Sequence, residues 1–589
     1  MIKTVKRKGV IIMKKFLLFI VSAILALCIC FSGCGVADEI ADGNTDSAME
    51  TTVETVSEEE ITATLPETTI TAKETTEDFT ITTENGAYSV DGDIYTITSA
   101  GTYTLTGYLQ GQILVNAGDD DDITIELKGA TIKYAYDSPI KILSADSVDI
   151  SAKADTENVI ADERIVGGTY ASGAGKGAIY AKADLKLKGT GTLVITGNYN
   201  NGVHTTKDLT IQKLTLGVSA YNNALKGNDS IKIISGTVQA ISTCGDGIKT
   251  ENTDADKSGN TRGDITFSGG TIQVWAAGDG VSAAHNFVME EGSSGGATVA
   301  VYTGAYSTYT SSSSTEDSFK GIKVENELNI SAGAIVIKSY DDGLHANYGT
   351  AFDAGGSGIG NINISGGTII ITVYSPEKTT AGGETPPTGG AGGGPFRPNG
   401  RFSASTFVQT AVKGADGIHA DNTLTVSGGT VKIDSSYEGL EANHIVISGG
   451  TTFVAGNDDG VNAAKKINET PTILVSGGYL DVSVSPNGDT DGIDSNGNYT
   501  QTGGIVITRG PNSEMAAAID ADGTVSISAG TLIVLGYGNV RTGGSVNTYS
   551  ISLNSAGSHT ITVGGTQYTF TNAYSYGRTT CYSSVSISA

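Results

Sequence analysis

The 589-residue sequence is poor in cysteine and in basic side chains. Three of its five cysteines fall within the first 34 residues, which leaves Cys244 and Cys581 far apart and without metal-ligand spacing. No disulfide framework is implied, and we expect both thiols to be free. The 36 lysines and arginines face 63 acids, a formal charge of −27, so nucleic acid is an improbable partner.

Long apolar runs are absent beyond the N-terminus. Lys14 and Lys15 precede an apolar run over residues 16–31, followed by Ser32-Gly33-Cys34. This is the layout of an export signal, and it resembles the lipobox of bacterial lipoproteins, with Phe31 where leucine is usual. We expect residues 1–33 to be a lipoprotein signal peptide and a lipid on Cys34 to hold the chain at the extracellular face of the cell membrane. An ordinary cleaved signal and an uncleaved anchor remain alternatives.

Aromatic residues are almost absent from residues 34–79. Residues 38–79 contain 13 acids and one lysine. Such a segment cannot bury enough apolar surface to fold, and its charges repel one another. We predict a disordered, extended tether. Loss of residues 1–33 removes six basic residues and no acid, which takes the formal charge to −33.

Glycine is abundant, at 80 residues, but it follows no Gly-X-Y period, which excludes collagen. A motif of an acid, glycine, an apolar residue, a variable residue and alanine instead begins at Asp416, Glu438 and Asp459, at separations of 22 and 21 residues. Ser-Gly-Gly-Thr stands between the copies, at 427–430 and 448–451. A period near 22 is typical of one turn of a parallel β-helix.

The repeat therefore predicts an all-β fold. We expect an N-terminal β cap over residues 80–135, the parallel β-helix over 136–535 and a C-terminal β cap over 536–589. A Gly/Pro-rich stretch at 376–406 interrupts the period and is predicted to be a mobile insertion.

The motif also assigns side chains to faces. Its apolar residue and alanine share the inward face, so the variable residue between them should point outward. This predicts an exposed column of His345, His419, Glu441, Asn462 and Asp494. The acids before the glycines would form a second column, where charges about 5 Å apart repel by about 3 kcal/mol at an effective dielectric near 20. Something positive should therefore lie among them.

Calcium is the expected cation, because it takes six to eight oxygen ligands. The candidate ligands come from adjacent turns and are Asp416, Glu438, Glu441, Asp458, Asp459, Asn462, Asp491 and Asp494. The alternative is that these carboxylates only solvate the surface. A transition metal at His345 and His419 is less favoured, because the region offers two histidines and no cysteine.

Aromatic side chains supply the candidate sugar platforms. Alternation turns Trp275 outward, and Tyr340 and Tyr437 end strands near the acidic edge. Packing is the alternative for the tyrosines.

Two motifs carry a family resemblance. They are Glu438-Gly-Leu-Glu441-Ala-Asn with Asn457-Asp-Asp-Gly-Val-Asn462-Ala-Ala, and Asn198-Tyr-Asn-Asn-Gly-Val-His204-Thr-Thr-Lys-Asp208-Leu. The sequence resembles the carbohydrate-binding β-helix surface proteins of anaerobic Gram-positive bacteria. The resemblance implies a right-handed parallel β-helix similar to pectate lyases, with bound calcium. It also implies display on the cell surface and binding of plant cell-wall polysaccharide such as cellulose or polygalacturonate.

The similarity to pectate lyases raises the possibility of catalysis. β-Elimination needs a base and cations that acidify the uronate proton. Lys323, one turn before Asp342 and His345, is the candidate base, but an acidic surface tends to raise a lysine pKa rather than lower it. We expect binding without cleavage; a calcium-dependent pectate-type lyase and a structural adhesin are the alternatives.

Overall fold

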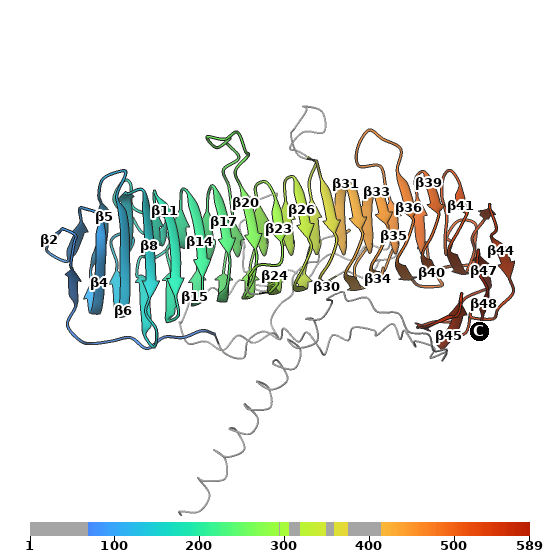
Figure 1. Ribbon diagram of the computed structural model, residues 1–589, viewed down its shortest axis with the longest axis horizontal. Coiled ribbons are helices and arrows are strands. Elements are labelled where there is room, and N and C mark those ends of the chain that lie inside the picture. The colour runs from blue at the N-terminus through green and yellow to red at the C-terminus, as the bar shows by residue number, and fades with distance from the viewer. Residues whose placement is uncertain (1–68, 294, 305–317, 349–358, 375–413) are drawn as a thin grey trace, which may run out of the picture. The chain divides into compact units, whose positions relative to one another are not determined.

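The computed structural model describes residues 69–293, 295–304, 318–348, 359–374 and 414–589. Within these ranges the regular structure consists of strands, without a helix, and nearly all of them pair in parallel with the strand one turn later. Figure 1 shows the strands stacked side by side along the coil. The predicted fold class, an all-β parallel β-helix with a β cap, is confirmed.

Three faces make up each turn. Face A carries the repeated motif and comprises β3 (Ile94–Ile97), β5 (Gln112–Asn116), β7 (Ile140–Ser144), β10 (Gly177–Ala181), β13 (Asn201–Thr205), β16 (Leu225–Gly227), β19 (Ile248–Lys249), β22 (Val281–Ala283), β25 (Ile322–Val324), β28 (Leu344–Ala346), β35 (Val461–Ala463) and β38 (Ile493–Ser495). Two longer strands, β31 (Ile418–Val426) and β33 (Leu440–Ile447), continue from face A into face B.

Face B comprises β8 (Ser147–Ala152), β11 (Asp184–Gly189), β14 (Asp208–Gln212), β17 (Ser230–Ile233), β20 (Asp264–Phe267), β23 (Phe287–Met289), β26 (Glu327–Ile330), β29 (Asn361–Ile364), β36 (Thr472–Val475), β39 (Asn498–Gln501), β41 (Val525–Ile527) and β43 (Val540–Thr542). Near the N-terminus, β4 (Gly101–Gln110) and β6 (Asp122–Tyr134) span faces B and C.

Face C comprises β9 (Glu157–Asp162), β12 (Thr192–Gly197), β15 (Leu214–Ala220), β18 (Gly236–Ser242), β21 (Thr271–Ala276), β24 (Thr298–Thr303), β27 (Ala334–Ser339), β30 (Thr368–Val373), β32 (Thr430–Ser435), β34 (Thr451–Ala455), β37 (Tyr479–Ser483), β40 (Ile505–Arg509) and β42 (Thr531–Leu535).

The core runs through the coil as one cluster of alternating apolar residues. Ile418 pairs with Leu440, Leu440 with Val461 and Val461 with Ile493, and all four side chains are fully buried. Because the side-chain period of a strand is two, this register turns every second residue of face A away from the core.

The motif glycine allows the turns to approach closely. A Cβ on Gly460 would lie 2.1 Å from Cγ1 of Val482 and 2.6 Å from the carbonyl oxygen of Gly492. The second glycine of each Ser-Gly-Gly repeat is required for another reason: its backbone is left-handed, with φ angles of 76° at Gly429 and 72° at Gly450. Side chains other than hydrogen are disfavoured at both kinds of position.

Both ends differ in detail from the sequence-based boundaries. Parallel pairing begins within the predicted N-terminal cap, where β3 pairs with β5, and only β1 (Thr80–Thr83) and β2 (Tyr88–Asp91) pair antiparallel there. Residues 69–79, assigned to the tether, lie against the β-helix: the Ile70 amide donates to Gln239 and the Thr75 amide to Thr131. The reason is that this end of the acidic segment offers its backbone to polar side chains on the outside of face C.

The C-terminal end closes the coil with antiparallel strands, near the predicted boundary. β42 pairs antiparallel with β47 (Thr579–Ser583), which also pairs with β44 (Asn547–Tyr549). A separate small sheet holds β45 (Gly557–Val563), β46 (Thr566–Asn572) and β48 (Ile587–Ser588).

Cys244 and Cys581 are both free thiols, as predicted. In the described part of the chain, no helix has the length and hydropathy that a membrane crossing needs. The predicted signal peptide, Cys34, residues 34–68 of the tether and the insertion at 376–406 lie outside the described residues.

Candidate functional site

Two columns of polar residues flank the bend that enters face A. The bend column consists of the residues before the motif glycines: Asp246, Asp279, Lys320, Asp342, Asp416, Glu438, Asp459 and Asp491. The Gly417 amide donates to the carbonyl of Glu438 at 2.9 Å, and the Gly439 amide to that of Asp459 at 3.0 Å. The predicted stacking of Asp416, Glu438 and Asp459 on consecutive turns is therefore confirmed.

The side chains of the bend column also connect successive turns. One carboxylate oxygen of Asp342 accepts the Asp416 amide hydrogen at 2.7 Å, one of Asp416 accepts that of Glu438 at 3.2 Å, and one of Asp459 accepts that of Asp491 at 2.8 Å. A short acid at this position satisfies a backbone donor that the bend leaves over. Each of these three acids has a second oxygen for other contacts.

The face column consists of the variable residues of the motif: Lys249, Ser282, Lys323, His345, His419, Glu441, Asn462 and Asp494. We expected the last five to be exposed, but His345, Glu441 and Asn462 are only 8%, 6% and 9% exposed. Alternation does turn them away from the core, yet neighbouring side chains cover them: Lys466 Nζ lies 2.6 Å from Glu441 Oε1.

At the centre of the two columns, five residues form the imidazole cluster: Asp342, His345, Asp416, His419 and Glu441. His345 Nδ1 lies 2.6 Å from Asp342 Oδ2, and His419 Nδ1 lies 3.0 Å from Asp416 Oδ2 and 2.7 Å from Glu441 Oε2. The two rings stack with centroids 4.7 Å apart at 18°. The sequence-based interpretation gave Asp416 and Glu441 to calcium and placed His345 and His419 in the column beside the acids, without assigning them to the same site.

In the imidazole cluster, burial and the neighbouring charges shift the pKa of Glu441 and of His419 in opposite directions. Burial alone would raise the pKa of Glu441, but the hydrogen bond and charge of His419, with Lys466, lower it to about 2. Burial would lower the pKa of His419, yet its contacts with Asp416, Asp421 and Glu441 raise it well above the usual range.

Beside the imidazole cluster, Glu438, Asp459, Asn462, Asp491 and Asp494 form the oxygen cluster. Among the described residues, no histidine or lysine contacts the acids of this cluster. Burial, together with the charges of Glu441, Asp416 and Asp459, raises the pKa of Glu438 to about 9. Burial and neighbouring acids also raise the pKa of Asp459 to about 7 and those of Asp491 and Asp494 to about 6. Carboxylates in this state favour a proton or another cation.

A buried amide oxygen is a further feature of the oxygen cluster that suits calcium. Asn462 Nδ2 donates to Glu438 Oε2 at 3.1 Å, whereas the buried Oδ1 of Asn462 accepts no hydrogen bond from the described protein groups. An amide oxygen and several carboxylates are ligands that calcium prefers. Asp458, the remaining predicted ligand, lies beside Tyr437 and raises the pKa of that phenol.

A cavity of about 320 Å³ opens beside both clusters. It is lined by Lys320, Asp341, Asp342, Gly414, Asp416, His419, Tyr437, Glu438, Glu441 and Lys466. Tyr437, a predicted sugar contact, therefore shares a cavity with the charged groups.

The other predicted sugar contacts have different surroundings. Trp275 is 2% exposed and its ring stacks on that of Tyr302 with centroids 5.7 Å apart, so the expected accessibility of Trp275 is wrong. The alternation does turn it away from the core, but Ile241, Ala300 and Tyr302 enclose it in a separate apolar cluster. Tyr340 instead stacks on Tyr374 at 4.9 Å, and Tyr374 is 57% exposed.

Lys323 lies where the sequence placed it, between Ser282 and His345 in the face column. Its Nζ lies 2.9 Å from Glu325 Oε1. The amine proposed as a base is therefore already paired with a carboxylate.

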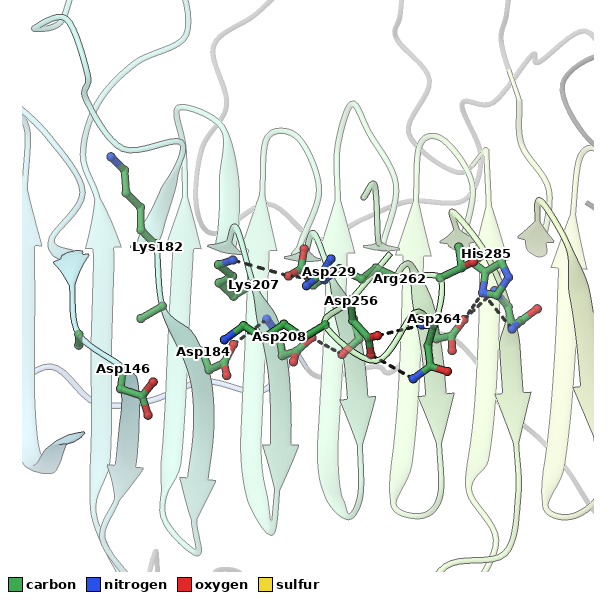
Figure 2. Close-up of a pocket in the computed structure, with 17 residues that line it drawn as sticks. Asp146, Lys182, Asp184, Lys207, Asp208, Asp229, Asp256, Arg262, Asp264 and His285 are labelled. Atoms are coloured by element: carbon green, nitrogen blue, oxygen red, sulfur yellow. Dashed lines mark hydrogen bonds and ion pairs between the residues drawn. The ribbon is translucent and has the colours of Figure 1, made fainter. Parts of the chain in front are cut away.

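A second groove, of about 850 Å³, lies outside the starts of the face B strands and was not predicted. Figure 2 shows its mixed charges: Arg262 Nε lies 3.0 Å from Asp229 Oδ2, and His285 Nδ1 lies 2.8 Å from Asp264 Oδ1. The signal in the sequence is an aspartate before the first apolar residue of a face B strand, as in Asp184, Asp208 and Asp264.

Comparisons with known proteins agree with the sequence resemblance. The family described as carbohydrate-binding domain-containing protein matches residues 91–373 and 356–460, more than half of the chain. A protein of that description from Acetivibrio thermocellus is 34% identical over 126 residues, which cover 21% of this chain and 44% of the relative, less than half of its length. A solved structure of a polysaccharide lyase-like protein from C. thermocellum, a gadolinium derivative, has 32% identity and a TM-score of 0.35, covering 42% of this chain and 91% of the other. The chain belongs to the carbohydrate-binding domain-containing protein family.

Proposed function

We propose that this protein binds plant cell-wall polysaccharide without cleaving it, at the extracellular face of a Gram-positive membrane to which a lipid on Cys34 anchors it. Calcium held by the oxygen cluster links the protein to acidic glycan such as polygalacturonate. Family membership supports a carbohydrate ligand. The observation that carries the calcium route is the stack of Glu438, Asp459 and Asp491, where the pKa of each carboxyl is raised.

Both partners in this proposal are polyanions. The protein without residues 1–33 has a formal charge of −33, and it and a glycan of uronate carboxylates repel each other in the absence of counterions. A calcium ion that keeps coordination positions open beyond the protein's oxygens can accept uronate oxygens as well, because it takes six to eight ligands. The cavity beside Glu438 and Tyr437 gives the glycan access to this edge.

Neutral glycan such as cellulose would use the tyrosines. Tyr340 and Tyr374 follow strands on successive turns of face C, and their stacked rings present an exposed surface at Tyr374. Aromatic faces pack well against the apolar faces of sugar rings.

Binding to insoluble polygalacturonate and cellulose, with calcium or with chelator, tests the proposal. We expect chelator, or the pair Asp459→Asn and Asp491→Asn, to abolish retention on polygalacturonate. The pair Asp119→Asn and Asp120→Asn, an equal charge change in an exposed turn, is the matched control and should leave retention unchanged. Calcium-independent retention would overturn the calcium route, and no retention on either glycan would favour a structural adhesin.

A second assay distinguishes binding without cleavage from pectate-type lyase activity. Polygalacturonate incubated with the protein and calcium is followed by absorbance for unsaturated uronate. We expect none to form. Product that Lys323→Ala abolishes would contradict binding without cleavage.

A further inference from the structure

We propose that the imidazole cluster binds one first-row transition metal ion such as Zn²⁺, through His345, His419 and the acids that face them, at a site separate from the oxygen cluster. This site does not depend on the proposed glycan function. Its evidence is the convergence of five side chains from three successive turns on one point between the two columns.

The candidate ligand atoms of the imidazole cluster lie close enough together to share one ion. One ligand atom from each of Asp342, His345 and His419 lies within 4.8 Å of the other two, and the same holds for Asp416, His419 and Glu441. The two groups share His419. The contacts between facing atoms are 2.6 to 3.0 Å, and ligands around a tetrahedral Zn²⁺ with bonds near 2.0–2.1 Å are about 3.3 Å apart. An outward shift of about half an ångström would make room for the ion.

Each acid of the imidazole cluster has one oxygen held by a backbone amide or by Lys466 and one directed at an imidazole. Asp342 Oδ1 accepts the Asp416 amide hydrogen, and Asp342 Oδ2 faces His345. Asp416 Oδ1 accepts the Glu438 amide hydrogen, and Asp416 Oδ2 faces His419. Glu441 Oε1 pairs with Lys466, and Glu441 Oε2 faces His419. The three remaining oxygens therefore converge on the two Nδ1 atoms.

The Nε2 atoms of both histidines have partners that fix the orientation of the rings. His345 Nε2 lies 2.6 Å from Asn347 Oδ1, and His419 Nε2 lies 3.2 Å from Asp421 Oδ1. Asn347 is itself fixed, since its Nδ2 donates to Glu325 at 2.9 Å. Histidine ligands of metals commonly donate the other ring N–H to a carboxylate or carbonyl, which fixes the ring and directs the free nitrogen to the ion. Both histidines here have such a partner.

The ligand chemistry selects the class of metal. Calcium takes oxygen ligands, whereas imidazole suits Zn²⁺, Cu²⁺, Fe²⁺ and Ni²⁺. Because an imidazole nitrogen belongs to both ligand groups, a transition ion is favoured over calcium. The cavity of about 320 Å³, lined by Asp342, Asp416, His419 and Glu441, gives an ion a way in.

Zinc titration of the full chain by calorimetry, with calcium in large excess, tests the site. We expect one equivalent of Zn²⁺ to bind and His345→Ala or His419→Ala to weaken it at least about tenfold, with a smaller loss in Asp421→Asn. His559→Ala, in β45 of the C-terminal cap, should bind as the unmodified chain does. Absence of zinc binding, unchanged affinity in His345→Ala/His419→Ala, or displacement of zinc by calcium would overturn the proposal.

Spectroscopy keeps the proposal testable if those variants fold poorly. The unmodified protein loaded with Cu²⁺ should show nitrogen hyperfine coupling from two imidazoles in its electron paramagnetic resonance spectrum. A spectrum with oxygen ligands alone would contradict the assignment. His419→Gln, which keeps a hydrogen-bonding side chain at that position, should fold and lose one of the two couplings.

Discussion

At the scale of single residues, the bend column gives each acid a structural and a chemical task. One oxygen of Asp342, Asp416 or Asp459 closes a backbone hydrogen bond to the next turn, and the other remains for a cation or an imidazole. At Glu441, the contacts with His419 and Lys466 lower the pKa. At Asp416, burial and the charges of Asp342 and Glu441 raise the pKa despite the contact with His419. At Glu438, which neither histidine nor lysine contacts among the described residues, the pKa is raised.

This contrast predicts how pH acts on Glu438 in calcium-free protein. Its folded-state pKa of about 9 exceeds the usual value of 4.5, so the folded state binds more protons than the unfolded state between these pH values. The contribution of Glu438 to stability is therefore present below the lower value and is lost as pH rises toward 9, by at most about 1.4 kcal/mol per pH unit.

Chemical denaturation of calcium-free protein and of Glu438→Gln, at a series of pH values, measures this effect. The stability of the unmodified protein relative to the variant should fall as pH rises from 5 to 9. If the stability of the unmodified protein relative to Glu438→Gln instead stays constant or rises with pH, Glu438 is charged in the folded protein.

At the scale of the element, each turn depends on a glycine that lets backbone approach backbone. Gly460→Ala places a methyl group 2.1 Å from Val482 Cγ1, and we expect it to destabilise the protein by about 1–3 kcal/mol, because overpacking forces neighbours to move. Thermal unfolding checks this. Gly543→Ala, whose added carbon would lie 3.9 Å or more from its neighbours, is the matched control and should change little. Equal stability of the two variants would contradict the close approach.

Strand ends give a second prediction at this scale. Tyr374→Ala should weaken cellulose binding by about 2- to 10-fold, the loss of about 0.5–1.5 kcal/mol of aromatic contact, with little effect on folding because the side chain is 57% exposed. Depletion assays on cellulose measure it. Tyr136→Ala, at a side chain that is 72% exposed, should bind as before. Equal losses in both variants would remove the role given to the tyrosine pair.

The sequence predicted the register of the turns better than it predicted exposure. Spacings of 22 and 21 residues sufficed to align Asp416, Glu438 and Asp459, because a slip of one residue would expose the apolar face. Exposure of Glu441 and Trp275 could not be predicted, because alternation gives the direction of a side chain and not what covers it. Lys466 covers Glu441 from 25 residues further along the chain, and Tyr302 covers Trp275 from 27.

At the scale of the whole molecule, the proposed lipid on Cys34, a residue outside the described ranges, would hold an acidic β-helix at a membrane surface. Cys34→Ala should move the protein from the membrane fraction to the medium, because a lipid chain supplies the membrane affinity. Immunoblots of both fractions, with Cys244→Ala as control, measure this. An unchanged membrane fraction would contradict lipid anchoring at Cys34.

Calcium-dependent stability measures whether the stacked acids of consecutive turns share a cation. A ligand present at 100 times its dissociation constant stabilises the folded state by about 2.7 kcal/mol. The unfolding temperature of the full chain should therefore rise with calcium and fall with chelator. Asp459→Asn with Asp491→Asn should remove the difference, while Asp119→Asn with Asp120→Asn preserves it. The same unfolding temperature in calcium and chelator would contradict the account.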